Sequence, residues 1–176
     1  IEETMEKHDI LRVEHEEGRK RLDLRRAYNQ SLTAGGTDPP SIKLSGRNRS
    51  SKPDKKYTVR IDQGGEITHV HFGQRGASDF TTHKDVARMV RFVRRHHGSR
   101  KKEWFAQMAE RAEEAGNKEE NDIIQEMLEV NKSRVENWFI NGMHTAGFWS
   151  RWLLWSYPSL KEAKAFMEEK FGIAFV

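Results

Sequence analysis

The chain has 176 residues, of which 35% are hydrophobic and 33% are charged, and its formal net charge at pH 7 is +4. It contains no cysteine, which excludes disulfides and thiolate metal sites, and no run of about 18 apolar residues, which excludes a membrane-spanning helix. We therefore expect a protein of a reducing intracellular compartment such as the nucleus, and we expect no secretion.

The small net charge hides a strong segregation of charge along the chain. Residues 43–102 carry 16 basic and 5 acidic side chains, a balance of +11, whereas residues 1–42 and 103–176 have balances of −2 and −5. A basic block of this density attracts polyanions. The alternative is that the block pairs with the acidic flanks inside one assembly.

The first part of the chain predicts two extended segments. Residues 1–30 have sparse apolar positions among charges of both signs, which predicts a charged helical arm that lies on a partner. Residues 31–55 combine glycine, serine, two consecutive prolines and basic residues without periodicity, which predicts a flexible linker or tail. We expect a basic α+β module to begin at residue 56 and to extend to residue 176.

Residues 57–73 predict an antiparallel β-hairpin. Apolar and polar residues alternate on both sides of Gly64-Gly65, a pair that suits a tight turn. Two strands alone are marginally stable, so a helix must cover their apolar face. An arginine-rich helix over 83–97 is the expected cover, because its apolar residues share one face and its arginines the other; the apolar set is Val86, Met89, Val90 and Val93.

A helical insertion is expected over residues 103–143, with a break at Gly116-Asn117. Apolar positions from Ile124 to Trp138 recur at steps of three and four, which predicts a short coiled-coil-like seam through Val135, long enough to pair with the N-terminal helix.

Three of the five tryptophans lie in TAGFWSRWLLWSYPSL, residues 145–160. The spacing predicts a helix that begins at Thr145, stops at Pro158, buries its aromatic face and directs Arg151 elsewhere. Another helix is expected over 159–171. The fold class is thus α+β: a β-hairpin packed by an arginine-rich helix and a Trp-rich helix, with long helical extensions.

Two motif blocks carry a family resemblance: HFGQRGASDFTTHKD at 71–85 with RRHH at 94–97, and TAGFWSRWLLWSYPSL at 145–160. They resemble a small basic protein family of large eukaryotic DNA viruses, to which the dinoflagellate viral nucleoproteins are similar. The resemblance implies a virus-associated basic protein, in some members a DNA-binding packaging protein, and supplies no activity to assign; it adds the virion to the expected locations. The acidic helical segment between Lys102 and His144 departs from the family pattern and favours docking into a protein shell or a ribonucleoprotein.

We therefore expect a non-enzymatic structural subunit of a large, virus-related assembly. Its expected partners are neighbouring proteins and nucleic acid, DNA or RNA, bound without sequence preference; no cofactor, metal, membrane or small-molecule substrate is expected. The residues expected to contact phosphate are Lys55, Lys56, Arg75, Lys84, Arg88, Arg91, Arg94, Arg95, Arg100, Lys101 and Lys102. The tryptophans expected to contact protein partners are Trp104, Trp138 and Trp149.

Three alternatives use the same features. One is a protein-only minor capsid or cement subunit, and another is an accessory subunit of a large ribonucleoprotein such as an organellar ribosome. The third is a metal-dependent hydrolase, which would draw its ligands from His69, His71, His83, His96, His97, Asp79 and Asp85. Within this region, Gly73 and Gly76 are expected to bend the chain after the second strand, and Asp79 to cap the amides around Thr81.

Overall fold

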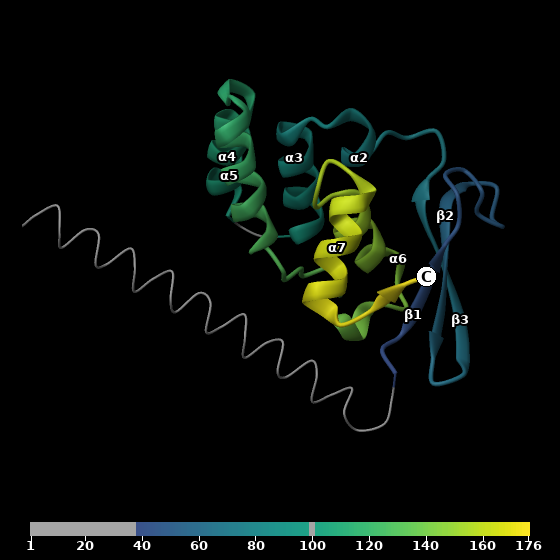
Figure 1. Ribbon diagram of the computed structural model, residues 1–176. Helices are drawn as coiled ribbons and strands as arrows, with labels where there is room; N and C mark the ends of the chain where they lie inside the picture. The colour runs from purple at the N-terminus through teal and green to yellow at the C-terminus, as the bar shows by residue number, and fades with distance from the viewer. Residues whose placement is uncertain (1–37, 99–100) are drawn as a thin grey trace, which may run out of the picture. The chain divides into compact units, whose positions relative to one another are not determined.

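The computed structural model describes residues 38–98 and 101–176, and the residues from Pro40 onward form one compact unit. The predicted helical arm over 1–30 and Arg100 lie outside the described residues. The described part combines a four-stranded sheet with helices, which confirms the α+β class (Figure 1). None of the described helices is long and apolar enough to cross a membrane.

The predicted hairpin is present and forms one side of the sheet. Strand β2 (Lys55–Gln63) pairs antiparallel with β3 (Glu66–Gln74), and Tyr57 lies opposite Phe72. Gly64 and Gly65, which connect the strands, both have positive φ, as the tight turn requires. The hairpin buries one face: Tyr57, Val59, Ile61, Val70 and Phe72.

The prediction of a linker over residues 31–55 is wrong for residues 41–44. These residues form strand β1 (Ser41–Leu44), which pairs antiparallel with β2, and the short strand β4 (Ala174–Phe175) pairs parallel with β1. The sheet order is therefore β3-β2-β1-β4. Ile42 is fully buried opposite Ile61, so this segment contributes to the core. Four residues are too few to show a periodic pattern, which is why the sequence did not predict them.

The Trp-rich segment covers the buried face of the hairpin. It begins with a single turn, α6 (Ala146–Trp149), and continues as a wider π-helical turn, η2 (Ser150–Leu154), both of which contact β3. The Trp149 ring lies 6.2 Å from the Phe72 ring. Helix α7 (Leu160–Phe171), predicted over 159–171, packs on η2.

Arg151 corrects one prediction about this segment, because its side chain is fully buried instead of pointing away. Its guanidinium donates hydrogen bonds to the carbonyls of Met127 (2.7 Å), Val130 (3.2 Å) and Trp155 (2.9 Å). It also lies 4.4 Å from the centre of the Trp152 ring, a cation–π distance. The Trp-rich segment is thereby tied to the carboxyl end of α5.

The arginine-rich helix forms as predicted but packs elsewhere. Helix α3 (Val86–His97) follows the short α2 (Phe80–His83), is capped by Asp85, and buries the predicted apolar residues. Its main contacts are with α4 (Lys102–Glu114) and α5 (Asn117–Leu128), whereas the hairpin is covered by the Trp-rich segment. The expectation that the arginine-rich helix covers the hairpin is therefore corrected.

The insertion confirms the predicted break but not the predicted seam. Helix α4 ends before Gly116 and α5 begins after it, yet no helix follows Leu128 until η1 (Ile140–Gly142). Val135, expected in the seam, is exposed. The carbonyls of Met127 and Val130, at and just after the end of α5, accept hydrogen bonds from the buried Arg151 side chain.

Candidate nucleic-acid interface

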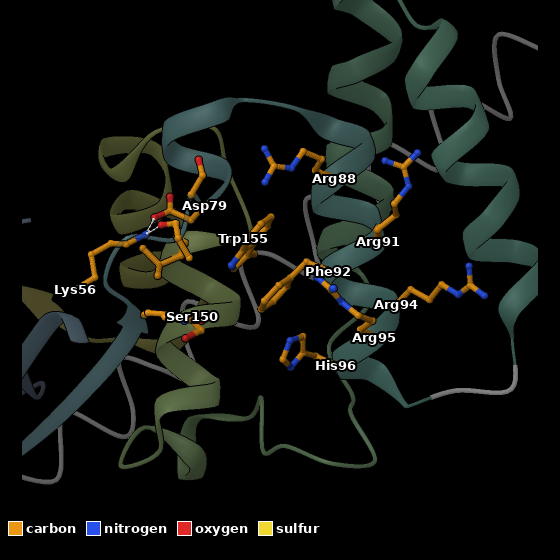
Figure 2. Close-up of a pocket in the computed structure, with 15 residues that line it drawn as sticks. Lys56, Asp79, Arg88, Arg91, Phe92, Arg94, Arg95, His96, Ser150 and Trp155 are labelled. Atoms are coloured by element: carbon orange, nitrogen blue, oxygen red, sulfur yellow. Dashed lines mark hydrogen bonds and ion pairs between the residues drawn. The ribbon is translucent and has the colours of Figure 1, made fainter. Parts of the chain in front are cut away.

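A groove with a volume of about 990 Å³ lies between α3 and the far end of the hairpin. Four arginines of α3, the loop after β3 and the end of the Trp-rich segment line it. Figure 2 shows the rings of Phe92 and Trp155 between the Lys56–Asp79 pair on one side and the arginines on the other. Its full lining is Lys56, Gly73, Gln74, Ala77, Ser78, Asp79, Arg88, Arg91, Phe92, Arg94, Arg95, His96, Ser150, Leu154 and Trp155.

The arginine wall follows from helical spacing. Arg88 and Arg95 are two turns apart and face the same side of α3. Arg91 and then Arg94 lie at larger angles from Arg88 around the helix axis, in the same direction. Within the described residues, the side chains of Arg88, Arg94 and Arg95 have no ion pair or hydrogen bond. This wall therefore presents guanidinium groups whose donors are available to a ligand.

Arg91 is the one member of the wall with a carboxylate partner in the described part of the chain. It forms an ion pair with Glu113 of α4, and both side chains are about half exposed. Ion pairs at such exposure contribute between about 0 and 1 kcal/mol, so a phosphate can compete for Arg91.

The opposite wall is held by a buried ion pair. The Lys56 ammonium donates to the Asp79 carboxylate at 2.7 Å and to the Ala77 carbonyl at 2.6 Å, and both charged side chains are almost fully buried. Asp79 also accepts the Thr81 amide at 3.0 Å and caps α2, as predicted. Lys56 lines the groove, but its charge is already paired, which corrects its assignment as a phosphate contact.

Gly73 shapes the same wall. Its φ is +74°, and a Cβ at this position would lie 3.1 Å from Leu154 and 3.2 Å from Lys56. Gly76 also has positive φ, so the predicted bend after β3 is confirmed. The bend brings the 77–79 loop over Lys56.

A column of rings forms the floor of the groove. Phe92 stacks on Trp155 with ring centres 4.2 Å apart and planes within 3°, His96 covers the other face of Phe92 at 4.1 Å, and His83 lies 5.3 Å from Trp155. Because the rings of Trp155 and His96 both stack on Phe92, nucleic-acid bases cannot stack on Phe92, and one face of Trp155 is already occupied. The column is a structural floor, and the ligand-binding chemistry of the groove is that of the arginines.

His83 is held neutral beside this floor. Burial, followed by the charge of Arg88, lowers the pKa of its imidazole. Its Nδ1 accepts the Asp85 amide at 2.9 Å, which places the proton on Nε2. His83 therefore adds no positive charge to the groove near pH 7.

Several predicted phosphate contacts lie away from the groove. Arg75 donates to the Lys55 and Ser50 carbonyls, and Lys84 donates to the Pro158 carbonyl at 2.6 Å. Arg75 and Lys84 therefore tie segments of the fold together. The remaining cations, Lys55 at the start of β2 and Lys101 and Lys102 at the start of α4, do not line the groove.

Two of the three predicted partner-contact tryptophans are buried. Trp138 and Trp149 lie in the core, and the Trp149 indole donates to the Met143 carbonyl at 2.6 Å, so their assignment to partner contact is wrong for this structure. Trp104 is 38% exposed and lines a second cavity of about 530 Å³ with Lys101, Phe105 and Lys132 among its neighbours. Its role as a contact stays a prediction.

A second group of basic residues, which sequence reasoning missed, lies on the solvent-facing side of the sheet. Lys43, Arg60 and His69 occupy one row across β1, β2 and β3, and all three are exposed. The row depends on the register of β1, a strand the sequence did not predict.

Among residues 38–98 and 101–176, no three histidines or acidic residues come together as a metal site. The three converging ligands that a metal hydrolase would need are therefore missing from this part of the chain.

Comparison with known proteins gives one family match. The model of a family of unknown function (DUF5754) matches residues 48–96. This range holds β2, β3, α2 and α3 up to His96, and thus the arginine wall and the Lys56–Asp79 pair, but not the Trp-rich segment. No curated protein and no solved structure matches the chain.

Proposed function

We propose that the chain is a non-enzymatic subunit of a larger assembly and that it binds the phosphate backbone of nucleic acid along α3. The observation that carries this proposal is the arginine wall: four guanidinium groups line one groove, and three of them have no partner in the described residues. Guanidinium groups bind phosphate oxygens in a two-point geometry, which suits them to this task better than lysine.

The length of the wall sets the expected footprint. Arg88 and Arg95 are seven residues apart, which corresponds to about 10.5 Å along the helix axis. One strand of duplex DNA presents a phosphate about every 3.4 Å of its axis, so the wall spans about three phosphates.

The chemistry of the groove favours binding without sequence preference. Contacts to phosphate carry no direct sequence information. The aromatic floor is already stacked, and the loop opposite the arginines is held by the Lys56–Asp79 pair, so neither offers a platform for reading bases.

Fluorescence anisotropy with labelled duplex DNA and single-stranded RNA tests this proposal on the full chain. The informative variant replaces Arg88, Arg94 and Arg95 with Gln. The matched control replaces three exposed lysines outside the groove, Lys118, Lys132 and Lys161, with Gln, which changes the net charge equally.

The arginine variant should lose at least tenfold in affinity, and the lysine control less than about threefold, because direct phosphate contacts outweigh the long-range field of the same net charge. Equal losses in the two variants would show that binding follows overall charge and not the groove. Thermal unfolding of both variants establishes that they remain folded.

One observation favours the protein-only alternative. The Arg91–Glu113 pair shows that an acidic side chain of α4 already contacts the basic block, as expected if that block pairs with acidic protein surfaces. Absence of nucleic-acid binding by the wild type at low salt would favour this alternative. The setting in a virion rests on the resemblance of the two motif blocks and stays a prediction.

A further inference from the structure

Strand β3 is a long edge strand with one unpaired side. The sheet order places β2 on one side of β3 and no strand on the other. Within the described residues, no backbone hydrogen bond other than those to β2 reaches residues 66–73. The outward N–H and C=O groups of β3 are therefore available for pairing with another strand.

The sequence of β3 lacks the features that usually protect an edge. Proteins block edge strands with lysine, proline, a covering segment or a very short strand. β3 has nine residues, contains no lysine, arginine or proline, and has its only charged residue, Glu66, at its start. The opposite edge, β4, has only two residues and offers little backbone to pair with.

Exposed apolar side chains accompany this edge. Ile67 of β3 is 46% exposed. On the other face of the strand Thr68 hydrogen-bonds His144 at 3.1 Å, and Phe139 and Ile140, which precede His144 in the chain, are 50% and 40% exposed. Apolar surface beside an unpaired edge is typical of an interaction site.

We propose that two copies of this chain pair antiparallel through their β3 edges, with the two-fold axis at Thr68, and form a continuous eight-stranded sheet. A two-fold interface requires a patch that is complementary to itself. This register places Thr68 beside its copy and Ile67 beside His69 of the second copy, so no like charges face each other.

Two features of the structure support this register. In this register, even-numbered residues of one copy lie opposite even-numbered residues of the other. The even-numbered residues Val70 and Phe72 face the core, so the buried face of one sheet continues into the buried face of the other. The residues it pairs, 66–70, are also clear of the loop before β2, whose Ser50 contacts His71 on the outer side of the sheet.

The dimer would bring two arginine walls and two copies of the outer Lys43–Arg60 pair of cations into one assembly. Linked binding sites raise the apparent affinity for a long polyanion without any new contact. The pairing itself does not depend on nucleic acid, so its test is independent of the proposed function.

Sedimentation velocity across a concentration series tests the pairing. The wild type should approach twice the 20.6 kDa of one chain. Replacing Ile67 and His69 with Lys places like charges directly opposite each other and should give a monomer. The control, Gln107→Lys with Ala165→Lys, adds the same charge at exposed positions of α4 and α7 and should remain dimeric.

Single-cysteine cross-linking tests the geometry, since the chain contains no cysteine of its own. His69→Cys and Lys43→Cys lie in the same row on the same side of the sheet. With strands about 4.8 Å apart, the two His69 positions would be within about 9 Å and the two Lys43 positions about 24 Å apart. A short bismaleimide should therefore link only the His69→Cys chains, and a monomeric wild type or equal cross-linking at both positions would overturn the proposal.

Discussion

The rings of Phe92 and Trp155 stack with centres 4.2 Å apart and planes within 3°. Phe92 belongs to α3 and Trp155 follows η2, so this contact joins the arginine wall to the Trp-rich segment. The position of the arginines relative to the 77–79 loop, and hence the groove, depends on this contact.

Removing the stack should destabilise the protein. Phe92→Ala deletes one ring and leaves Trp155 and His96 without their partner, at an expected cost of about 3 kcal/mol in unfolding free energy. Urea denaturation, followed by circular dichroism, measures this change in the free energy of unfolding. Trp104→Ala, which removes an exposed ring, should cost less than about 1 kcal/mol; equal losses would show that the stack contributes little.

The buried pair between Lys56 and Asp79 gives a second prediction. Lys56→Met leaves the Asp79 carboxylate buried without a cation, which should cost about 3–5 kcal/mol. Lys55→Met is the matched control, because the neighbouring lysine has no ion pair in the described residues, and it should change stability by about 0.5 kcal/mol or less. If urea titration showed that Lys56→Met leaves the free energy of unfolding unchanged, this role of the buried pair would be contradicted.

Arg151 gives a third prediction. Burial lowers the pKa of its guanidinium to about 9, so it is still charged at pH 7, and the carbonyls of Met127, Val130 and Trp155 stabilise that charge. Arg151→Met should destabilise the fold by at least about 3 kcal/mol, because it removes three hydrogen bonds to charged donors from the interior. Arg134→Met, at an exposed arginine, should have little effect in thermal unfolding; similar losses in both variants would contradict the prediction.

Stability should fall in mild acid because of the half-buried His97. Burial, followed by the charge of Lys101, lowers the pKa of His97 below its usual 6.5. Between the folded and unfolded pKa values the unfolded chain binds more protons, so this contribution is complete above pH 6.5 and is lost as the pH falls through the folded value. His97→Phe should therefore reduce the loss of unfolding free energy between pH 7 and pH 5, and an unchanged loss in this variant would contradict the prediction.

The sequence predicted the features that depend on local pattern. The hairpin, the buried side of α3, the break before Asn117 and the Asp79 cap each follow from periodicity or from one residue's turn preference. The arginine wall was predicted for the same reason, because helical spacing alone places its members on one side.

The features that were missed depend on distant contacts. β1 is short and is stabilised by pairing with β2 and β4, which no local pattern reveals. The burial of Arg151 requires three carbonyls supplied by other parts of the chain, and the charge of Lys56 is paired only because the loop after β3 folds over it. These contacts decide which cations remain available for phosphate, so the candidate site could be predicted only in part.

The central claim is that the arginines of α3 contact phosphate directly, and the salt dependence of binding tests it most directly. Each neutralised phosphate on duplex DNA contributes about −0.9 to the slope of log affinity against log salt concentration. The wild type should give a slope of about −3 or steeper. In the variant that lacks the charges of Arg88, Arg94 and Arg95, the slope should be less negative by about 2 to 3. An unchanged slope in that folded variant would contradict the account.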